Sequence, residues 1–174
     1  FTSAWGSVMH ATQVGVVNDV IRSHGVKRLL EIACGPARLS RDVTGFERGF
    51  ICEFNDSMLS VARRRLAAAN GRWQLVRGDA FRLPFSQAES LDLVYTFRFI
   101  RHFESADRST LYGQIRSVLR KNGFFVFDAV NAKVGLPWST RDGVDPQLVF
   151  DEYYSPEVLD QELKDHGFTR VSMT

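Results

Sequence analysis

The chain has 174 residues, of which 44% are hydrophobic, and its 22 lysines and arginines are nearly balanced by 20 aspartates and glutamates. This composition is typical of a globular protein and excludes a wholly disordered or collagen-like chain. No stretch approaches the roughly 20 consecutive apolar residues of a membrane span, so we expect no membrane partner. The small net charge does not indicate a nucleic-acid partner, and the length predicts a single domain over residues 1–174.

Taken in chain order, segments of helical and strand character alternate. Apolar residues at helical spacing, with capping and stop residues at the ends, predict helices at 8–23, 39–46, 58–69, 107–120 and 156–166. We expect Asp56 or Ser57 to cap the third of these. Short apolar runs bounded by turn residues predict strands at 28–33, 49–54, 73–77, 91–97, 124–130 and 168–173. The alternation predicts an α/β fold, a three-layer sandwich around a mostly parallel twisted sheet, with ligands at the carboxyl ends of its strands.

Two local features carry weaker signals. Cys34 and Cys52 are too few for a disulfide scaffold and predict free buried thiols in a reducing, cytoplasmic setting, although a disulfide between neighbouring strands is the alternative. The run Arg63-Arg64-Arg65 is typical of a solvated helix face.

The first predicted strand leads into the loop Glu31-Ile32-Ala33-Cys34-Gly35-Pro36-Ala37-Arg38. Small side chains there let the backbone approach a ligand closely. A dinucleotide fingerprint requires glycine at three set positions, and here only Gly35 is present. Pro36 also lacks an N–H, which argues against clamping of a pyrophosphate. A tight turn without any ligand is the alternative interpretation.

Acidic residues follow the next two strands. Glu53 lies about 20 residues beyond the first loop, where a carboxylate can accept hydrogen bonds from both hydroxyls of a ribose. Phe54 follows and can lie against a base. Asp79 follows Gly78 and can accept from an exocyclic amine, while Phe81 can cover the other face of an adenine. The alternatives are a capping or surface acid for Glu53 and an ordinary turn residue for Asp79.

Together these residues resemble the class I S-adenosylmethionine-dependent methyltransferases of the small-molecule type, over residues 27–172. Four segments in matching order carry the resemblance: the acidic-x-small-Cys-Gly loop at 31–38, the ribose-binding acid with its Met-Leu-x-x-Ala-Arg helix at 53–63, the adenine-edge motif at 78–85, and the fourth-strand motif at 90–102.

The resemblance implies a Rossmann-like enzyme that transfers a methyl group from S-adenosylmethionine to an O, N, C or S nucleophile of a small molecule, without a metal. It also implies the cofactor-binding residues, which are Glu31, Ala33, Gly35, Arg38, Glu53, Phe54, Met58, Asp79, Ala80, Phe81, Thr96 and Phe97. Two features depart from the family pattern. Ala33 and Ala37 replace its flanking glycines, and the chain stops at Thr174, so we expect the usual last strand to be missing or replaced.

The acceptor should lie beside the reactive methyl group. His102 is the candidate catalytic base because histidine titrates near neutral pH, and a structural histidine is the alternative. Arg98 and Arg101 are candidates to attract an anionic acceptor, with plain solvation as the alternative.

An irregular segment at residues 131–154 is longer than most connections in compact domains and predicts a substrate loop. Trp138, Tyr153 and Tyr154 are candidates to line an apolar acceptor pocket, and ordinary packing is their alternative role. The N-terminal helix, with Trp5 and His10, is a further candidate.

Three other functions compete with an active small-molecule enzyme. The alanines of the first loop and the absent last strand fit a catalytically degenerate cofactor-binding domain that acts through protein contacts. A nicotinamide-dependent dehydrogenase lacks support without the three-glycine fingerprint. An amino-methylating enzyme of DNA lacks its Pro-Pro-aromatic motif, since the fourth strand ends in Thr96-Phe97-Arg98-Phe99.

Overall fold

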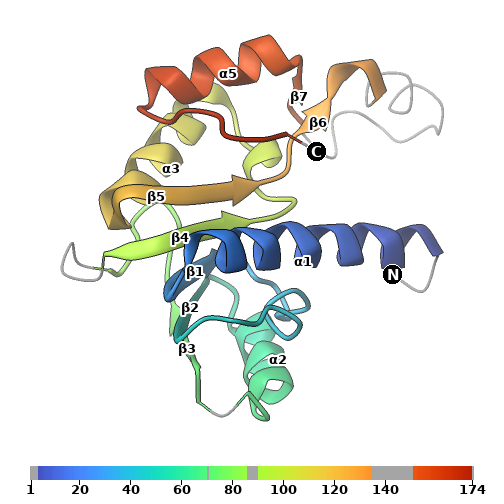
Figure 1. The fold of residues 1–174 in the computed structure, drawn as a ribbon, viewed down its shortest axis with the longest axis vertical. Coiled ribbons are helices and arrows are strands. Elements are labelled where there is room, and N and C mark those ends of the chain that lie inside the picture. Colours follow the sequence, from blue (N-terminus) through green and yellow to red (C-terminus); the bar gives the residue numbers. More distant parts are fainter. Residues whose placement is uncertain (1–3, 70, 86–89, 135–150, 174) are drawn as a thin grey trace. The chain divides into compact units, whose positions relative to one another are not determined.

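The structure is a computed structural model that describes residues 4–69, 71–85, 90–134 and 151–173 (Figure 1). The chain divides into two compact units, residues 1–97 with 114–126 and residues 98–113 with 127–174. The elements are α1 Ala4–His24, β1 Arg28–Ile32, β2 Arg48–Glu53, α2 Asp56–Leu66, β3 Trp73–Arg77, β4 Leu91–Thr96, the short 3-10 helix η2 Ile100–His102, α3 Ser105–Val118, β5 Leu119–Phe127, β6 Val130–Asn131, β7 Tyr153–Tyr154 and α5 Pro156–Asp165. No helix of these residues is long and apolar enough to cross a membrane.

The first unit is built on a five-stranded sheet with the strand order β3-β2-β1-β4-β5. β1 pairs in parallel with β2 on one side and with β4 on the other, so that Leu30 lies opposite both Phe50 and Val94. β2 and β3 are also parallel. The expected α/β fold with a mostly parallel sheet is therefore confirmed. The chain reverses its direction of travel across the sheet between β1 and β4, and ligands bind such sheets at this point.

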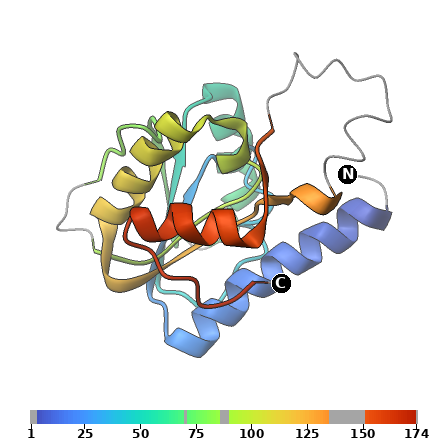
Figure 2. The same ribbon diagram turned by 90° about the horizontal axis from the view of Figure 1, so that it is seen from above.

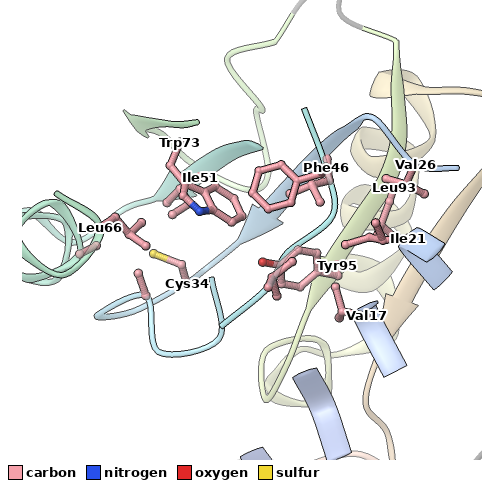
Figure 3. Close-up of a cluster of buried hydrophobic side chains, with 14 of the residues drawn as sticks. Val17, Ile21, Val26, Cys34, Phe46, Ile51, Leu66, Trp73, Leu93 and Tyr95 are labelled. Atoms are coloured by element: carbon pink, nitrogen blue, oxygen red, sulfur yellow. The ribbon is translucent and has the colours of Figure 1, made fainter. Parts of the chain in front are cut away.

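One face of the sheet is covered by α1 and α2. Figure 3 shows Val17 and Ile21 of α1 beside Leu93 and Tyr95 of β4, all buried, while Leu66 of α2 lies near the other end of the same cluster. Each large apolar side chain buried in this way contributes about 1.5–3 kcal/mol to stability. The cluster therefore holds β1, β2 and β4 against the two helices.

The edge of this core depends on a glycine. The Trp73 ring lies 4.9 Å from the Phe46 ring, centroid to centroid, and covers the backbone of Gly49. A Cβ atom on Gly49 would lie 2.5 Å from the Trp73 ring, closer than such atoms can approach. The small residue thus lets the tryptophan close the sheet at β2.

The expected helix at residues 39–46 is wrong, since this segment forms only turns. A polar side chain of α1 binds backbone groups of this segment that a helix would need for its own hydrogen bonds. The Asn18 amide oxygen accepts from the Thr44 N–H at 3.0 Å, and its nitrogen donates to the Asp42 carbonyl at 3.4 Å. Gly45, at φ +85°, then turns the chain toward β2.

Several element boundaries also differ from those expected. α1 begins four residues earlier than residue 8, at Ala4, and α2 is capped by Asn55, whose side-chain oxygen accepts from the Met58 N–H at 3.1 Å. Neither Asp56 nor Ser57 is the cap. α2 ends at Leu66 and α3 at Val118, before the expected residues 69 and 120.

The second unit contains most of α3 together with β6, β7 and α5. Figures 1 and 2 show α5 alongside α3, and a buried ion pair joins the two helices. Arg108 of α3 donates to both carboxylate oxygens of Glu162 of α5, at 2.8 and 2.7 Å. Glu162 also accepts from the Tyr112 hydroxyl at 2.8 Å. α5 begins at Pro156, as the sequence predicts, and the structure adds that the Ser155 side chain caps it by accepting from the Val158 N–H.

The expected strand at residues 168–173 is wrong, because no strand forms there. The apolar side chains of Val171 and Met173 are exposed, so no neighbouring strand among the described residues covers this segment. Arg170 instead pairs with Asp160 of α5 at 2.8 Å. In the described part of the chain, β6 and β7 form the only other sheet, a parallel pair of two residues each that the sequence did not predict.

Candidate functional site

The loop after β1 takes an unusual backbone path. Ala33, Gly35 and Ala37 have φ values of 55°, 55° and 52°, in the left-handed region that favours glycine. For residues with a side chain this conformation costs roughly 1–2 kcal/mol each. A Cβ atom on Gly35 would meet nothing within 4 Å, so the loop faces open space at this glycine. A ligand can therefore approach the backbone at the carboxyl end of β1, and this loop is called the candidate cradle below.

Glu53 joins this loop to the start of α2. Its carboxylate is buried and accepts from the Gly35 N–H and from the Asn55 N–H, both at 2.8 Å. Beside it, Phe54 and Met58 are 67% and 42% exposed. Phe54 and Met58 thus offer apolar contacts beside a polar group, the combination that small-molecule sites use.

Glu31 lies inside β1, where it accepts hydrogen bonds from the Ser40 hydroxyl and, at 3.0 Å, from the Tyr95 hydroxyl. Burial raises the pKa of Glu31 to about 7, although these two hydrogen bonds lower it and the charge of Glu53 raises it further. The positive charge of Arg38 acts to lower it. A neutral carboxyl and a carboxylate are therefore both populated near neutral pH.

The third strand end is shaped by a second glycine. A Cβ atom on Gly78 would lie 2.8 Å from the Cys52 sulfur and from Pro84, so only glycine fits there. Asp79 is exposed, and its Oδ1 atom accepts from the Phe81 N–H at 2.9 Å. Ala80, between them, is buried.

The fourth strand end holds β4 against β1. Thr96 is buried, and its hydroxyl donates to the Ile32 carbonyl at 2.8 Å, so this hydroxyl already has a partner within the sheet. The Phe97 ring follows, 6.3 Å from the Tyr95 ring. Because the ends of parallel strands share one edge, the residues expected at the four strand ends of the first unit lie along that edge.

The two cysteines are free thiols, as expected. Burial raises the pKa of both, to about 12 for Cys52. Both are therefore neutral at physiological pH and serve as small apolar side chains of the core.

In the second unit, His102 is paired with a carboxylate. Its Nδ1 atom lies 3.0 Å from Asp151 Oδ1, and the same oxygen lies 3.1 Å from Arg101 Nε. The Arg101 carbonyl also accepts from the Glu152 N–H at 2.8 Å. Asp151 could not be predicted from the sequence, because only the fold brings it to His102 from about 50 residues along the chain.

Asp128 is a second carboxylate that the sequence analysis missed. It accepts from the Arg98 N–H at 2.6 Å, and burial raises its pKa. Its position could have been noticed, since an acid directly after the apolar run Phe124–Phe127 is costly without a partner.

The remaining candidates have different surroundings. Tyr153 lies half-buried in β7, while Tyr154 is buried under the Arg108 guanidinium, 5.3 Å from its ring, and therefore packs within the second unit. His10 pairs with Asp42 at 2.7 Å. Trp5 is 72% exposed, and Trp138 lies outside the described residues.

Residues 29–123 match the family model described as "Methyltransferase domain". This match covers more than half of the chain, so the chain belongs to that family. No curated protein sequence matches it significantly.

Solved structures share the fold. A S-adenosylmethionine-dependent methyltransferase from Clostridium acetobutylicum ATCC 824 is 17% identical, with a TM-score of 0.72 over 90% of this chain and 80% of that one. The mitomycin 7-O-methyltransferase MmcR is 19% identical, with a TM-score of 0.73 over 92% of this chain and 48% of that one. The small RNA methyltransferase HEN1 is 16% identical, with a TM-score of 0.73 over 90% of this chain and 21% of that one.

Family and fold together identify the chain as a class I S-adenosylmethionine-dependent methyltransferase. The resemblance in sequence motifs is thereby confirmed at the level of family, enzyme class and cofactor. Within the described ranges, no group of three histidine, cysteine, aspartate or glutamate side chains is placed to hold a metal ion.

Proposed function

We propose that the methyl acceptor of this enzyme is a small molecule. The observation that carries this proposal is that several arginines of each unit are paired with acids and so are not available as single charges for phosphates. Examples are Arg77 with Asp56 at 3.1 Å in the first unit and Arg101 with Asp151 at 3.1 Å in the second. A nucleic-acid enzyme needs a clustered positive surface. The likeness to MmcR is consistent with the proposal, and the equal likeness to HEN1 means that the fold does not decide it.

The cradle at Gly35 fits the cofactor, because a ligand there meets backbone and small side chains. Glu53 is the proposed partner of the ribose hydroxyls, since each carboxylate oxygen retains a second lone pair beside its backbone bond. Asp79 is the proposed partner of the adenine amine, with Phe54 and Phe81 against the base. The other residues proposed to line the cofactor are Glu31, Ala33, Arg38, Met58, Ala80, Thr96 and Phe97.

The cofactor supplies the reactive methyl group, carried on a sulfonium, and the protein supplies orientation. His102 is the proposed base for an acidic O–H or N–H of the acceptor. Asp151 Oδ1 lies 3.0 Å from Nδ1 and places a negative charge beside the ring, and Nε2 is the proposed atom that takes the proton. Arg98, Arg101 and Tyr153 are proposed as acceptor contacts, with the segment 131–154 as the source of acceptor choice within a single functional domain. The free buried thiols support a cytoplasmic site of action.

The first test is calorimetric titration with S-adenosylmethionine, its demethylated product S-adenosylhomocysteine, and NAD. We expect the first two to bind in the micromolar range and NAD not to bind. Methyl transfer from labelled cofactor would then be measured on a panel of small hydroxyl, amine and thiol compounds and on total RNA and DNA. Transfer to nucleic acid alone would overturn the small-molecule proposal while leaving the enzyme class intact.

The role of His102 is tested by the pH dependence of kcat in His102→Ala and Asp151→Asn. Loss of a general base costs about 10²–10⁴-fold in rate. We expect His102→Ala to lose this activity without a change in affinity for S-adenosylhomocysteine, and Asp151→Asn to lower kcat by a smaller factor. Unchanged rates in both variants would assign the pair a structural role.

A further inference from the structure

The loop at residues 33–38 is held from both sides by charged side chains of the β2–α2 segment. The Gly35 N–H donates to Glu53 Oε2 at 2.8 Å, and the Pro36 carbonyl accepts from Arg65 Nη1 at 2.7 Å. The dipeptide Gly35-Pro36 is thus bonded at its N–H by a carboxylate and at its C=O by a guanidinium. Because proline has no N–H, this carbonyl is the only polar backbone group through which Pro36 can be held.

Arg65 differs from the two arginines before it. In the last turn of α2, Arg63 and Arg64 are exposed while Arg65 is half-buried. Successive helix residues point about 100° apart, so three in a row cannot share one face. The sequence-based interpretation of the whole run as a solvated face is therefore wrong for Arg65.

The loop needs such support because its backbone is strained. Alanines occupy two of its left-handed positions, at Ala33 and Ala37, where glycine would be more favourable. A loop that is already ordered binds a ligand without a further loss of conformational freedom. Charge-assisted hydrogen bonds are stronger than neutral ones, so the guanidinium is well suited to keep the loop in one conformation.

We propose that Arg65 is a positioning residue for the cofactor, which holds the Gly35-Pro36 dipeptide in the conformation that receives the methionine part of S-adenosylmethionine. It acts through the Pro36 carbonyl and does not touch the cofactor. The inference rests on the proposed placing of the cofactor at residues 33–38. It gives α2 two tasks, since its N-terminal end follows Glu53 and its C-terminal end braces the loop.

The test compares Arg65→Met, which keeps the aliphatic stem but removes every donor, with Arg65→Lys, which restores one donor. Arg64→Met is the matched control, one residue away and exposed. Affinity for S-adenosylhomocysteine is measured by calorimetry, and fold stability by urea unfolding. From the usual strength of a hydrogen bond to a charged group, we expect Arg65→Met to weaken binding about 10-fold or more. Arg65→Lys should recover most of this loss, and Arg64→Met should bind as the unchanged protein does.

Equal affinity of Arg65→Met and the unchanged protein would overturn the inference. So would failure of Arg65→Met to fold, because the arginine would then support the fold and not the loop alone. If the unchanged protein itself does not bind S-adenosylhomocysteine, the proposed placing of the cofactor fails, and that outcome is distinct from the failure of Arg65 alone.

Discussion

Two buried glutamates beside the candidate cradle differ in their partners. Glu31 is met by two hydroxyls, those of Ser40 and Tyr95, which can themselves rotate to donate or accept. Glu53 is met by two backbone N–H groups, of Gly35 and Asn55, which can only donate. A neutral carboxyl is therefore tolerated at Glu31. At Glu53, each carboxyl oxygen faces an N–H donor and must accept a hydrogen bond.

This difference predicts a pH effect at Glu31. Its pKa is about 7 in the folded protein and near 4.5 when unfolded. Between these values the folded state holds a proton that the unfolded state has lost, so stability falls as pH rises from about 4.5 to about 7. The total loss is on the order of 3 kcal/mol.

Glu31→Gln cannot ionise and should remove this slope. The free energy of unfolding in urea would be measured at several pH values from 5 to 8 for the unchanged protein and the variant, with Glu104→Gln on the surface as the control. Parallel curves for Glu31→Gln and the unchanged protein would show that Glu31 does not titrate in this range.

Glu53→Gln should weaken binding of S-adenosylhomocysteine about 10- to 150-fold, because a hydrogen bond to a charged acceptor is worth roughly 1.5–3 kcal/mol. The change also affects the fold, since one oxygen that accepts from Gly35 or Asn55 becomes an NH₂ group that faces a donor. We therefore also expect a loss of about 1–3 kcal/mol in the free energy of unfolding.

Calorimetry and urea unfolding on the same preparation measure both effects of Glu53→Gln. Glu47→Gln, at an exposed ion pair with Lys27, is the control and should change neither by much. Full affinity in Glu53→Gln would place the ribose elsewhere.

At the scale of elements, local sequence patterns predicted the bounds of a strand or helix wherever no long-range contact opposed them. β1, β2, β3 and β4 lie within one residue of their expected bounds, because each is a short apolar run between turn residues. The segment at 39–46 has a helical pattern as well, but Asn18 takes its backbone groups from 24 to 26 residues away. No local pattern reports such a contact.

The candidate site, too, could be predicted from the sequence only in part. The acids at the strand ends were visible in the sequence, since charge directly after an apolar strand is costly without a use. Their internal partners were not, because the Gly35 N–H and the Pro36 carbonyl meet Glu53 and Arg65 only after the sheet has formed. The pairing of His102 with Asp151 is likewise a product of the fold.

Asp92 joins three strands at the edge of the sheet opposite the candidate site. Its Oδ2 accepts from the Lys27 and Arg28 N–H groups, both at 2.8 Å, and its Oδ1 accepts from Arg120 Nε at 2.5 Å. Burial alone would raise the pKa of Asp92, but these hydrogen bonds together lower it. The stabilisation is present above the ordinary pKa of an aspartate and is lost as pH falls through the lower folded value.

Asp92→Asn should lower the free energy of unfolding by about 2–3 kcal/mol at pH 7, because an amide nitrogen would face a donor. The difference from the unchanged protein should shrink at a pH of about 3, below the ordinary pKa of an aspartate, because the unfolded chain there binds a proton that the folded carboxylate resists. Urea unfolding at both pH values measures this. Asp19→Asn, at an exposed pair with Arg22, is the control and should cost less than about 1 kcal/mol. A constant difference at both pH values would contradict the electrostatic origin.

At the scale of the whole molecule, the two units carry different parts of the proposed function. Residues proposed to hold the cofactor form hydrogen bonds within the first unit, as Gly35 does to Glu53 and Thr96 does to Ile32. The His102–Asp151 pair and the Arg108–Glu162 pair are both internal to the second unit. Stability of the second unit and affinity for the cofactor should therefore be separable.

Arg108→Lys tests this separation. Lysine keeps the positive charge but cannot form the two parallel hydrogen bonds that Arg108 makes to Glu162, so we expect a loss of about 1–3 kcal/mol in the free energy of unfolding. Affinity for S-adenosylhomocysteine should stay within about twofold, because no cofactor contact is altered.

At a ligand concentration of about 100 times Kd, both proteins should gain about 2.7 kcal/mol, which raises Tm by roughly 5–10 °C for a chain of this size. Thermal unfolding without the ligand measures the loss of stability in Arg108→Lys, and unfolding with the ligand measures the gain in Tm from binding. Glu53→Gln is the contrasting variant, in which we expect the gain from the ligand to be lost. If affinity instead falls in proportion to stability in Arg108→Lys, cofactor binding depends on the second unit, and the first unit alone does not hold the site.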